Sequence, residues 1–312
     1  MYRSCVTARW KIIAAYVTLC VVWSSTWLAI KLGLADLPPI SFAAIRFLIA
    51  FVVLVAVSVG RVQLLPKTTL DWLLLAGTGV LMFAVNYGLL FWGELHVSSG
   101  LAAVLQATIP VFGMLFAHWF LPAEPLRLKQ VAGSLISIAG VALICSRLFG
   151  GAGKLAFLGG LGISLGGAGA AFSNVLLKRR AMKLAPAMLA AWQMIFGAVP
   201  LFFVGVAVDG NPLRFHWTPL AIGCLLYLAV IGSSLTFLLL YWLLPRLPVN
   251  QLQTISLITP PGAVAIGWIF GGEKFSLLSL GGGAFVLAGV WMIFGKAEPV
   301  DTPCETEAAM SR

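Results

Sequence analysis

The sequence predicts an all-α integral membrane protein with ten transmembrane helices, built as two inverted five-helix repeats with both termini in the cytoplasm. Composition, a series of long apolar stretches and an internal duplication lead to this prediction. Of the 312 residues, 61% are hydrophobic and only 10% are charged, and the mean hydropathy is +1.02. Soluble domains are about half apolar and about one quarter charged. A chain this apolar is typical of a polytopic membrane protein.

Ten apolar stretches approach or exceed the length of a membrane span, which takes about 20 residues in a helix. The ten stretches are 12–32, 40–59, 72–93, 98–121, 130–148, 156–178, 185–208, 218–243, 249–271 and 277–295. Short segments rich in Gly, Pro, Asp and Asn connect many of them. The first stretch follows basic residues, as in a signal peptide, but it is longer than a cleavable apolar region. We therefore expect it to be retained as a span.

Basic residues indicate the orientation of these spans. With the N-terminus inside, fourteen of the twenty lysines and arginines fall in cytoplasmic segments, most densely in 178–183. Lys31 and Arg46 fall within spans, and the outer loops hold only four, which are Arg147, Lys154, Arg214 and Lys274. Cytoplasmic loops of membrane proteins are enriched in Lys and Arg, so both termini are predicted to be cytoplasmic. The net charge of +10 fits this bias, and no basic soluble domain indicates nucleic-acid binding.

The chain contains two related halves. A shift of 149 pairs Glu124, Gly133 and Gly140 with Glu273, Gly282 and Gly289. A shift of 147 nearer the start of each half pairs Arg46 with Gln193. We therefore predict a first repeat over 1–150, a second over 151–297 and a disordered cytoplasmic tail over 298–312.

The paired residues also carry structural expectations. Each glycine pair is seven residues apart, two helical turns on one face, which predicts the close approach of a neighbouring helix. We expect each glutamate to lie at the membrane interface beside the free N–H groups at the start of the following span.

Five spans per repeat is an odd number, so the second repeat must enter the membrane from the opposite side. Inverted repeats recur in secondary transporters, because the two halves can exchange shapes that open to either side of the membrane. The duplication therefore favours a transporter over a receptor or an enzyme.

Two motifs near the start, "WSSTWLAIKLGL" (23–34) and "LPPISFAAIRFLIA" (37–50), resemble the opening of an EamA-type member of the drug/metabolite transporter superfamily. The Pro, Glu and Gly blocks that close each half resemble the close of an EamA repeat, although "LPAEP" departs from the Gly–Glu pair that "GGE" keeps. The resemblance covers about residues 12–295. It implies a ten-helix exporter of small metabolites, with a weaker similarity to YddG-like exporters of aromatic and other neutral amino acids.

Patterns typical of enzymes are weak. "GISLG" (162–166) matches the nucleophile-elbow pattern around Ser164, but it sits within a span among glycines and reads better as a G-x-x-x-G helix-packing face. The five cysteines are scattered and no metal-binding motif occurs. We expect no enzymatic activity, cofactor or metal. The expected partners are a small-molecule substrate and the lipid bilayer, and the protein is expected to be a monomer or homodimer.

Polar and aromatic residues within spans are the candidates for substrate binding, because polar groups inside a membrane usually face a cavity or another helix. They fall on repeat-related spans, as a central site between the repeats requires. The candidates are Trp23, Ser24, Trp27, Asn86, Tyr87, Phe91, Gln106, Asn174, Tyr241 and Gln253. Each could instead bond to its own helix or pack in the core.

Three further features concern gating and charge. Pro110 and Pro260 lie at similar places in the two repeats and are predicted to interrupt their spans and act as hinges. Arg46 could attract a substrate carboxylate, but pairing with Glu94 or Asp36, or extension towards the membrane surface, is the favoured interpretation. Lys178 is expected to anchor its span at the interface.

These observations predict an inner-membrane secondary transporter that exports small metabolites by alternating access, with aromatic or other neutral amino acids as the favoured class. Export down a gradient is favoured, and proton antiport through Glu94 is the alternative for coupling. A carrier for drugs or other metabolites, a channel and a membrane-embedded enzyme are the alternative functions.

Overall fold

The protein is described by a computed structural model, in which residues 2–59, 65–94, 96–97, 99–144, 153–180, 184–271 and 277–294 are described. These residues form helices and turns, with no strand among them. The prediction of an all-α fold is confirmed. The predicted tail over 298–312 lies outside the described residues.

The described residues of the first half form seven α-helices and one π-helix. They are α1 (Tyr2–Gly33), α2 (Pro39–Ser58), α3 (Thr69–Gly79), the π-helix η1 (Val80–Val85), α4 (Asn86–Glu94), α5 (Ser99–Gln106), α6 (Ile109–Phe120) and α7 (Leu128–Ile144). The second half follows the same order. It comprises α8 (Lys154–Arg180), α9 (Pro186–Asp209), the short η3 (Pro212–Arg214), α10 (Pro219–Ala229), the π-helix η4 (Val230–Leu235), α11 (Thr236–Leu243), α12 (Val249–Gln253), α13 (Ile255–Gly271) and α14 (Leu277–Phe294).

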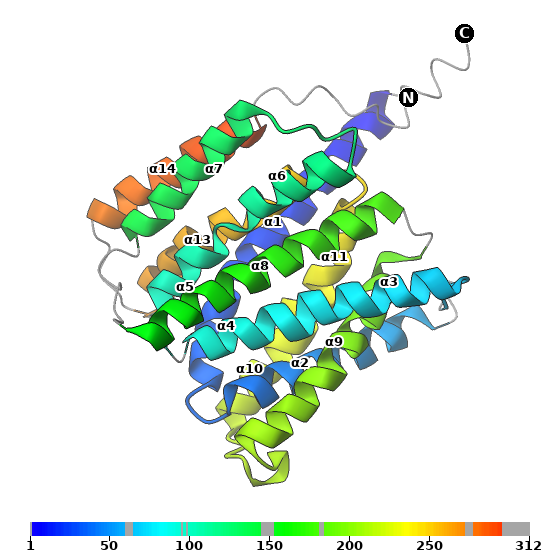
Figure 1. Cartoon of the computed structure of the whole chain (residues 1–312), viewed down its shortest axis with the longest axis vertical. Helices are drawn as coiled ribbons and strands as arrows, with labels where there is room; N and C mark the ends of the chain where they lie inside the picture. The colour runs from blue at the N-terminus through cyan, green and yellow to red at the C-terminus, as the bar shows by residue number, and fades with distance from the viewer. Residues whose placement is uncertain are drawn as a thin grey trace.

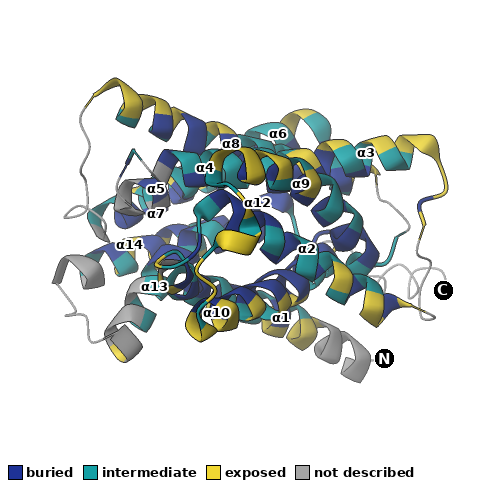
Figure 2. Cartoon of the chain, turned by 90° about the horizontal axis from the view of Figure 1, so that it is seen from below, coloured by how far each residue is buried: buried dark blue, intermediate teal, exposed yellow. Residues whose placement is uncertain are grey.

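Six helical stretches in the described part of the chain are long and apolar enough to cross a membrane. They are Arg9–Ile30, Pro39–Ser58, Thr69–Gly93, Lys154–Arg180, Pro186–Asp209 and Pro219–Leu243, and three shorter apolar helices accompany them. Exposed residues lie on the outward faces of the helices (Figure 2), and many are large and apolar, such as Phe203 and Trp291. A soluble protein rarely exposes so many, whereas lipid favours them.

Helices of the two halves pair with their equivalents. Figure 1 shows α7 and α14 side by side at one edge, and α2 packs along α9. The long helices α1 and α8 take equivalent central places, since α8 contacts α4 and α6 while α1 contacts α11 and α13. This arrangement leaves α1, α8 and their neighbours to enclose the middle of the molecule.

Glycines set the closest of these contacts, as the spacing predicted. A side-chain carbon on Gly133 of α7 would lie 2.6 Å from the carbonyl oxygen of Gly289 in α14, and one on Gly140 would lie 2.6 Å from that of Gly282. Neither distance leaves room for a methyl group. The glycines of α7 therefore allow close approach of α14, the equivalent helix of the other half.

Polar contacts tie the loops at one end of the helices. The carboxylate of Asp36, after α1, accepts a hydrogen bond of 2.6 Å from the hydroxyl of Thr218. That bond, helped by His216, lowers the pKa of Asp36. The carboxylate of Asp209, at the end of α9, accepts a 2.6 Å hydrogen bond from the backbone N–H of Ser41 in the first turn of α2. Free N–H groups at a helix start favour such a negative charge.

The α7–α14 contact predicts opposite effects for two glycines of one helix. Replacing Gly289 with Ala should force the helices apart and destabilise the protein by about 1–3 kcal/mol. Replacing Gly283 with Ala should be neutral or stabilising, because nothing lies within 4 Å of the added carbon and alanine favours a helix. The stability of both variants is measured by heating the detergent-purified proteins and monitoring the loss of folded protein by size-exclusion chromatography. Equal stability of the two variants would contradict the packing described here.

Candidate functional site

A cavity of about 180 Å³ lies between the two halves. Its wall draws on α1, α2, η1, α4, α5, α6, α8, α11, α12 and α13. One enclosed water needs only roughly 10–15 Å³ on the same measure, so the space is large enough for a small organic molecule. The position between repeat-related helices is where secondary transporters hold their substrates.

Eight of the ten predicted binding residues line this cavity. They are Trp23, Trp27, Asn86, Tyr87, Phe91, Gln106, Asn174 and Gln253. On α1 the wall continues through Thr26 and Ile30, which are not among the ten predicted residues. Their spacing of three and seven residues from Trp23 places them on its helix face, and that periodicity could have found them.

Ser24 and Tyr241, the other two predicted residues, lie outside the wall. The hydroxyl of Ser24 donates a 2.7 Å hydrogen bond to the carbonyl of Cys20 in its own helix, and its side chain faces Gly262 of α13. Tyr241 is only 3% exposed and packs in the main apolar cluster. Helix periodicity explains the difference for Ser24, which turns about 100° from Trp23 towards the neighbouring helix.

Four amide side chains contribute polar atoms to the wall. Nε2 of Gln106 donates a 3.3 Å hydrogen bond to Oδ1 of Asn86, which joins α5 to α4. Nε2 of Gln253 lies 3.5 Å from the carbonyl of Ala171 in α8. Oδ1 of Asn174 and Oε1 of Gln253 have no hydrogen-bond partner among the described residues. Buried acceptors without partners are rare in folded proteins and mark places where a further donor would be favourable.

Aromatic rings form much of the remaining wall. Trp23 of α1 meets Phe237 of α11 edge-on, with ring centroids 5.7 Å apart. Tyr87 of α4 lies 4.8 Å from Phe47 and 6.3 Å from Phe91 between ring centroids. Ring clusters of this kind hold their geometry well and present apolar and π faces to a ligand.

Arg46 also lines the cavity, and its surroundings contradict part of the sequence interpretation. The residue is only 3% exposed, so its side chain does not extend to the surface. Asp36 is bonded to Thr218 and is not its partner. Instead, Nε of Arg46 donates a 2.7 Å hydrogen bond to the hydroxyl of Ser233, and Nη2 donates a 3.2 Å bond to the carbonyl of Gly232. The side chain of Glu94 lies outside the described residues.

The acceptors for Arg46 come from a π-helix. η1 and η4 occupy equivalent places in the two halves, each between the two α-helical parts of one long helix. A π turn widens the helix and disturbs its regular hydrogen bonds, and such turns are frequent at functional sites. In η4 the carbonyl of Gly232 accepts bonds from Arg46 and from the hydroxyl of Thr236. No pattern in the sequence predicted either π turn.

The predicted hinges lie close to breaks in the helices but not at them. The first break covers residues 107–108, and Pro110 follows it within the first turn of α6, where proline removes no helix bond. The second break is at Thr254, between α12 and α13, while the helix continues through Pro260. The hydroxyl of Thr254 bonds to the carbonyl of Gln251, which competes with regular helix formation. Pro260 itself lines the cavity.

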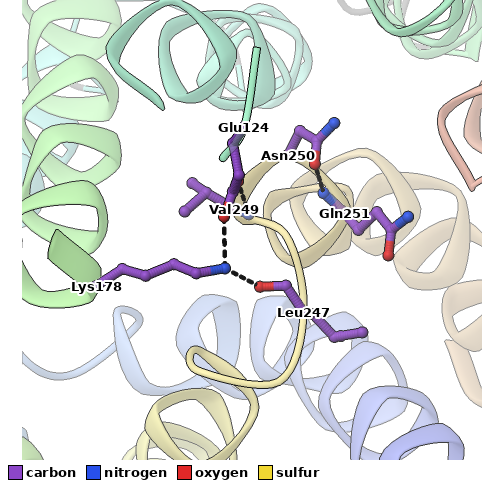
Figure 3. A network of polar contacts seen from close by, with 6 residues as sticks. All are labelled: Glu124, Lys178, Leu247, Val249, Asn250 and Gln251. Carbon is purple, nitrogen blue, oxygen red and sulfur yellow. Dashed lines mark hydrogen bonds and ion pairs between the residues drawn. The ribbon is translucent and has the colours of Figure 1, made fainter. Parts of the chain in front are cut away.

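A second polar cluster, the Glu124 network, joins three segments at one end of the bundle (Figure 3). It consists of Glu124, Lys178, Leu247 and Val249. Oε1 of Glu124, between α6 and α7, lies 2.6 Å from Nζ of Lys178 near the end of α8. Oε2 accepts a 2.6 Å hydrogen bond from the backbone N–H of Val249 at the start of α12, and Lys178 also donates to the carbonyl of Leu247.

The Glu124 network corrects two expectations. The helix start beside Glu124 is that of α12 in the other half and not that of the following helix, α7. Lys178 forms an ion pair, with side chains only 18% exposed for Lys178 and 14% for Glu124, in place of a simple interfacial anchor. Loop contacts between distant segments leave no trace in a single sequence, so neither feature was predictable from spacing.

The G-x-x-x-G interpretation of residues 162–166 is confirmed. A side-chain carbon on Gly166 would lie 3.0 Å from the backbone of Asn86, so the glycine lets α8 approach α4 beside the cavity. Among the residues whose placement is described, no group of three or more His, Cys, Asp or Glu could hold a metal ion.

Comparisons with known proteins agree with this architecture. The EamA-like transporter family matches residues 10–146 and 157–295, which gives two copies of the family domain. The uncharacterized inner membrane transporter YedA of Escherichia coli is 30% identical and is matched over 95% of this chain and 96% of its own. The probable terminal-alkyne amino-acid exporter of Streptantibioticus cattleyicolor is 29% identical, over 94% and 98%.

A solved structure supports the fold. It superimposes with a TM-score of 0.79 at 19% identity, over 93% of this chain and 99% of the other. The family matches together span most of the chain and cover all or most of each long helix; only the starts of α1 and α8 precede them. The chain therefore belongs to the EamA-like transporter family.

Proposed function

We propose that this transporter exports small metabolites, namely aromatic or other neutral amino acids and related compounds, across the inner membrane by alternating access. The observation that carries the proposal is the cavity between the halves, whose wall combines amide groups, aromatic rings and one guanidinium. Such a wall suits a small polar molecule with an apolar part. The relative named as a probable amino-acid exporter supports the same substrate class.

The proposed topology has ten spans in two inverted repeats, 1–150 and 151–297, with both termini in the cytoplasm. Equivalent helix bounds support the repeats, since α3 and α10 begin 150 residues apart, as do η1 and η4. The excess of basic residues in the segments assigned to the cytoplasm supports the orientation. With five spans in each repeat, the two copies have opposite orientations.

Alternating access requires contacts that hold one end of the cavity closed and can be released. The Glu124 network fits this requirement, because it joins the end of α8 to the start of α12, and both helices contribute to the cavity wall. Charge-assisted hydrogen bonds at such a partly buried place contribute about 1.5–3 kcal/mol. That is enough to bias a two-state equilibrium without fixing it. On the proposed topology, this closed end is cytoplasmic.

Export of amino acids can be tested in growing cells. Overproduction of the chain should raise the tolerated concentration of toxic amino-acid analogues, because an exporter lowers their concentration inside the cell. Growth on a panel of analogues and of cationic drugs, with efflux of labelled amino acids measured in parallel, gives the answer. Tolerance of cationic drugs alone would favour the alternative of a drug efflux carrier.

Mutations of two buried polar residues can distinguish a role in the cavity wall from a role in the apolar core. Asn174→Leu keeps the volume but removes the amide from the wall, and should lower the transport rate at least roughly tenfold. Tyr241→Phe removes a hydroxyl that also lacks a partner in the described part of the chain, but outside the wall, and should leave transport unchanged. Initial rates in proteoliposomes, corrected for protein content, measure both. Loss of transport in Tyr241→Phe but not in Asn174→Leu would show that the proposed location of the binding site is wrong.

The Glu124 network makes a prediction about the closed end. Glu124→Gln should open this end more often and increase cytoplasmic labelling of a cysteine introduced at Leu252, which lines the cavity from α12. The five native cysteines are first replaced, and an impermeant maleimide is added to inside-out vesicles. Exchanging the charges, with Glu124→Lys and Lys178→Glu together, should restore part of the protection. Equal labelling in all variants would rule out a closing role.

A further inference from the structure

Arg46 is a buried cation without a counterion among the described side chains. Four carboxylates have described side chains, and each has another partner. Asp36 binds Thr218, Asp71 lies 3.1 Å from Arg180, Glu124 binds Lys178, and Asp209 accepts from the backbone of Ser41. A charged group that is removed from water normally has an opposite charge beside it. The positive charge of Arg46 has only neutral partners in this part of the chain.

The surrounding structure holds the guanidinium in one position. Its two hydrogen bonds, to Ser233 and Gly232, come from one side, where η4 lies. The rings of Phe47 and Tyr87 flank it, with centroids 5.1 and 5.8 Å from its central carbon. A guanidinium has five N–H groups, and these bonds use two of them. A fixed guanidinium in a cavity wall is suited to a carboxylate, which it can bind through two parallel hydrogen bonds.

The second repeat provides no matching charge. Gln193, the equivalent of Arg46, is fully buried outside the wall and donates to the hydroxyl of Thr78 at 2.6 Å. No other lysine, arginine, aspartate or glutamate is among the wall residues in the described part of the chain. The cavity therefore carries one positive charge on one side, which disfavours a cationic drug and favours a single carboxylate.

We propose that Arg46 binds the carboxylate of the substrate and that the transporter selects monocarboxylates, zwitterionic amino acids among them. This inference rests on the proposed export function and specifies its substrate class. For a zwitterion, neutral wall residues remain for the ammonium group, among them Asn174 and the aromatic Trp23 and Trp27. The aromatic wall then contacts the side chain.

The test compares amino acids with their carboxamides, which keep the ammonium group but lose the carboxylate. Proteoliposomes are loaded with an equimolar mixture of the proteinogenic amino acids and, separately, with the corresponding amides, and efflux of each compound is followed by mass spectrometry. The wild type should release one or more amino acids at least roughly tenfold faster than their amides. Arg46→Gln should remove that preference by slowing the acids, and Arg46→Lys should retain only part of it.

Arg246→Gln is the matched control. Arg246 is an exposed arginine that stacks on Trp242 outside the cavity wall, so its loss should leave the preference intact. Should Arg46→Gln fail to fold, Ser233→Ala serves in its place, because it removes only the hydrogen bond that positions the guanidinium. It should raise the KM for the acid and leave kcat unchanged.

The possible outcomes distinguish failure of carboxylate binding by Arg46 from failure of the proposed amino-acid export. Absence of efflux of every amino acid by the folded wild type would overturn amino-acid export itself. Equal efflux of acids and amides by the wild type would overturn only the role of Arg46. An unchanged preference in folded Arg46→Gln, or in Ser233→Ala where that variant replaces it, would do the same.

Discussion

The structure depends on how closely equivalent helices of the two halves can approach. Between lipid-covered helices there is no hydrophobic driving force, so association relies on dense packing at small residues and on internal hydrogen bonds. Gly133 and Gly140 of α7 against Gly289 and Gly282 of α14 supply such packing. With these contacts at one edge and α2 against α9 elsewhere, helices of both halves, α2 among them, surround the cavity.

The cavity shows where two similar halves have become different. α1 and α8 occupy equivalent places, but α1 presents the indole rings of Trp23 and Trp27, whereas α8 presents Ala170 and Asn174. The one guanidinium comes from the first half alone. A symmetric scaffold explains how the molecule is assembled, while these differences make the contributions of the two halves to the cavity wall unlike. A substrate with a polar end and an apolar end requires a cavity whose wall is polar in one part and apolar in another.

Sequence patterns predicted the features that follow from periodicity and repetition. Apolar length located the helices, and the shift of 149 identified the glycines that meet between α7 and α14. Helix assignment also brought eight of the ten candidate residues to one wall. What was missed depends on contacts between distant segments. Neither the hydrogen bond that the backbone N–H of Val249 donates to Glu124 nor the π turn that accepts from Arg46 has a local signature in the sequence.

The two π turns have a historical consequence. Val80–Val85 and Val230–Leu235 are 150 residues apart and interrupt the same helix in each half. A π turn accommodates an extra residue, and each such change is an uncommon event in a helix. Its presence at equivalent places is expected if the turn is older than the second copy of the domain.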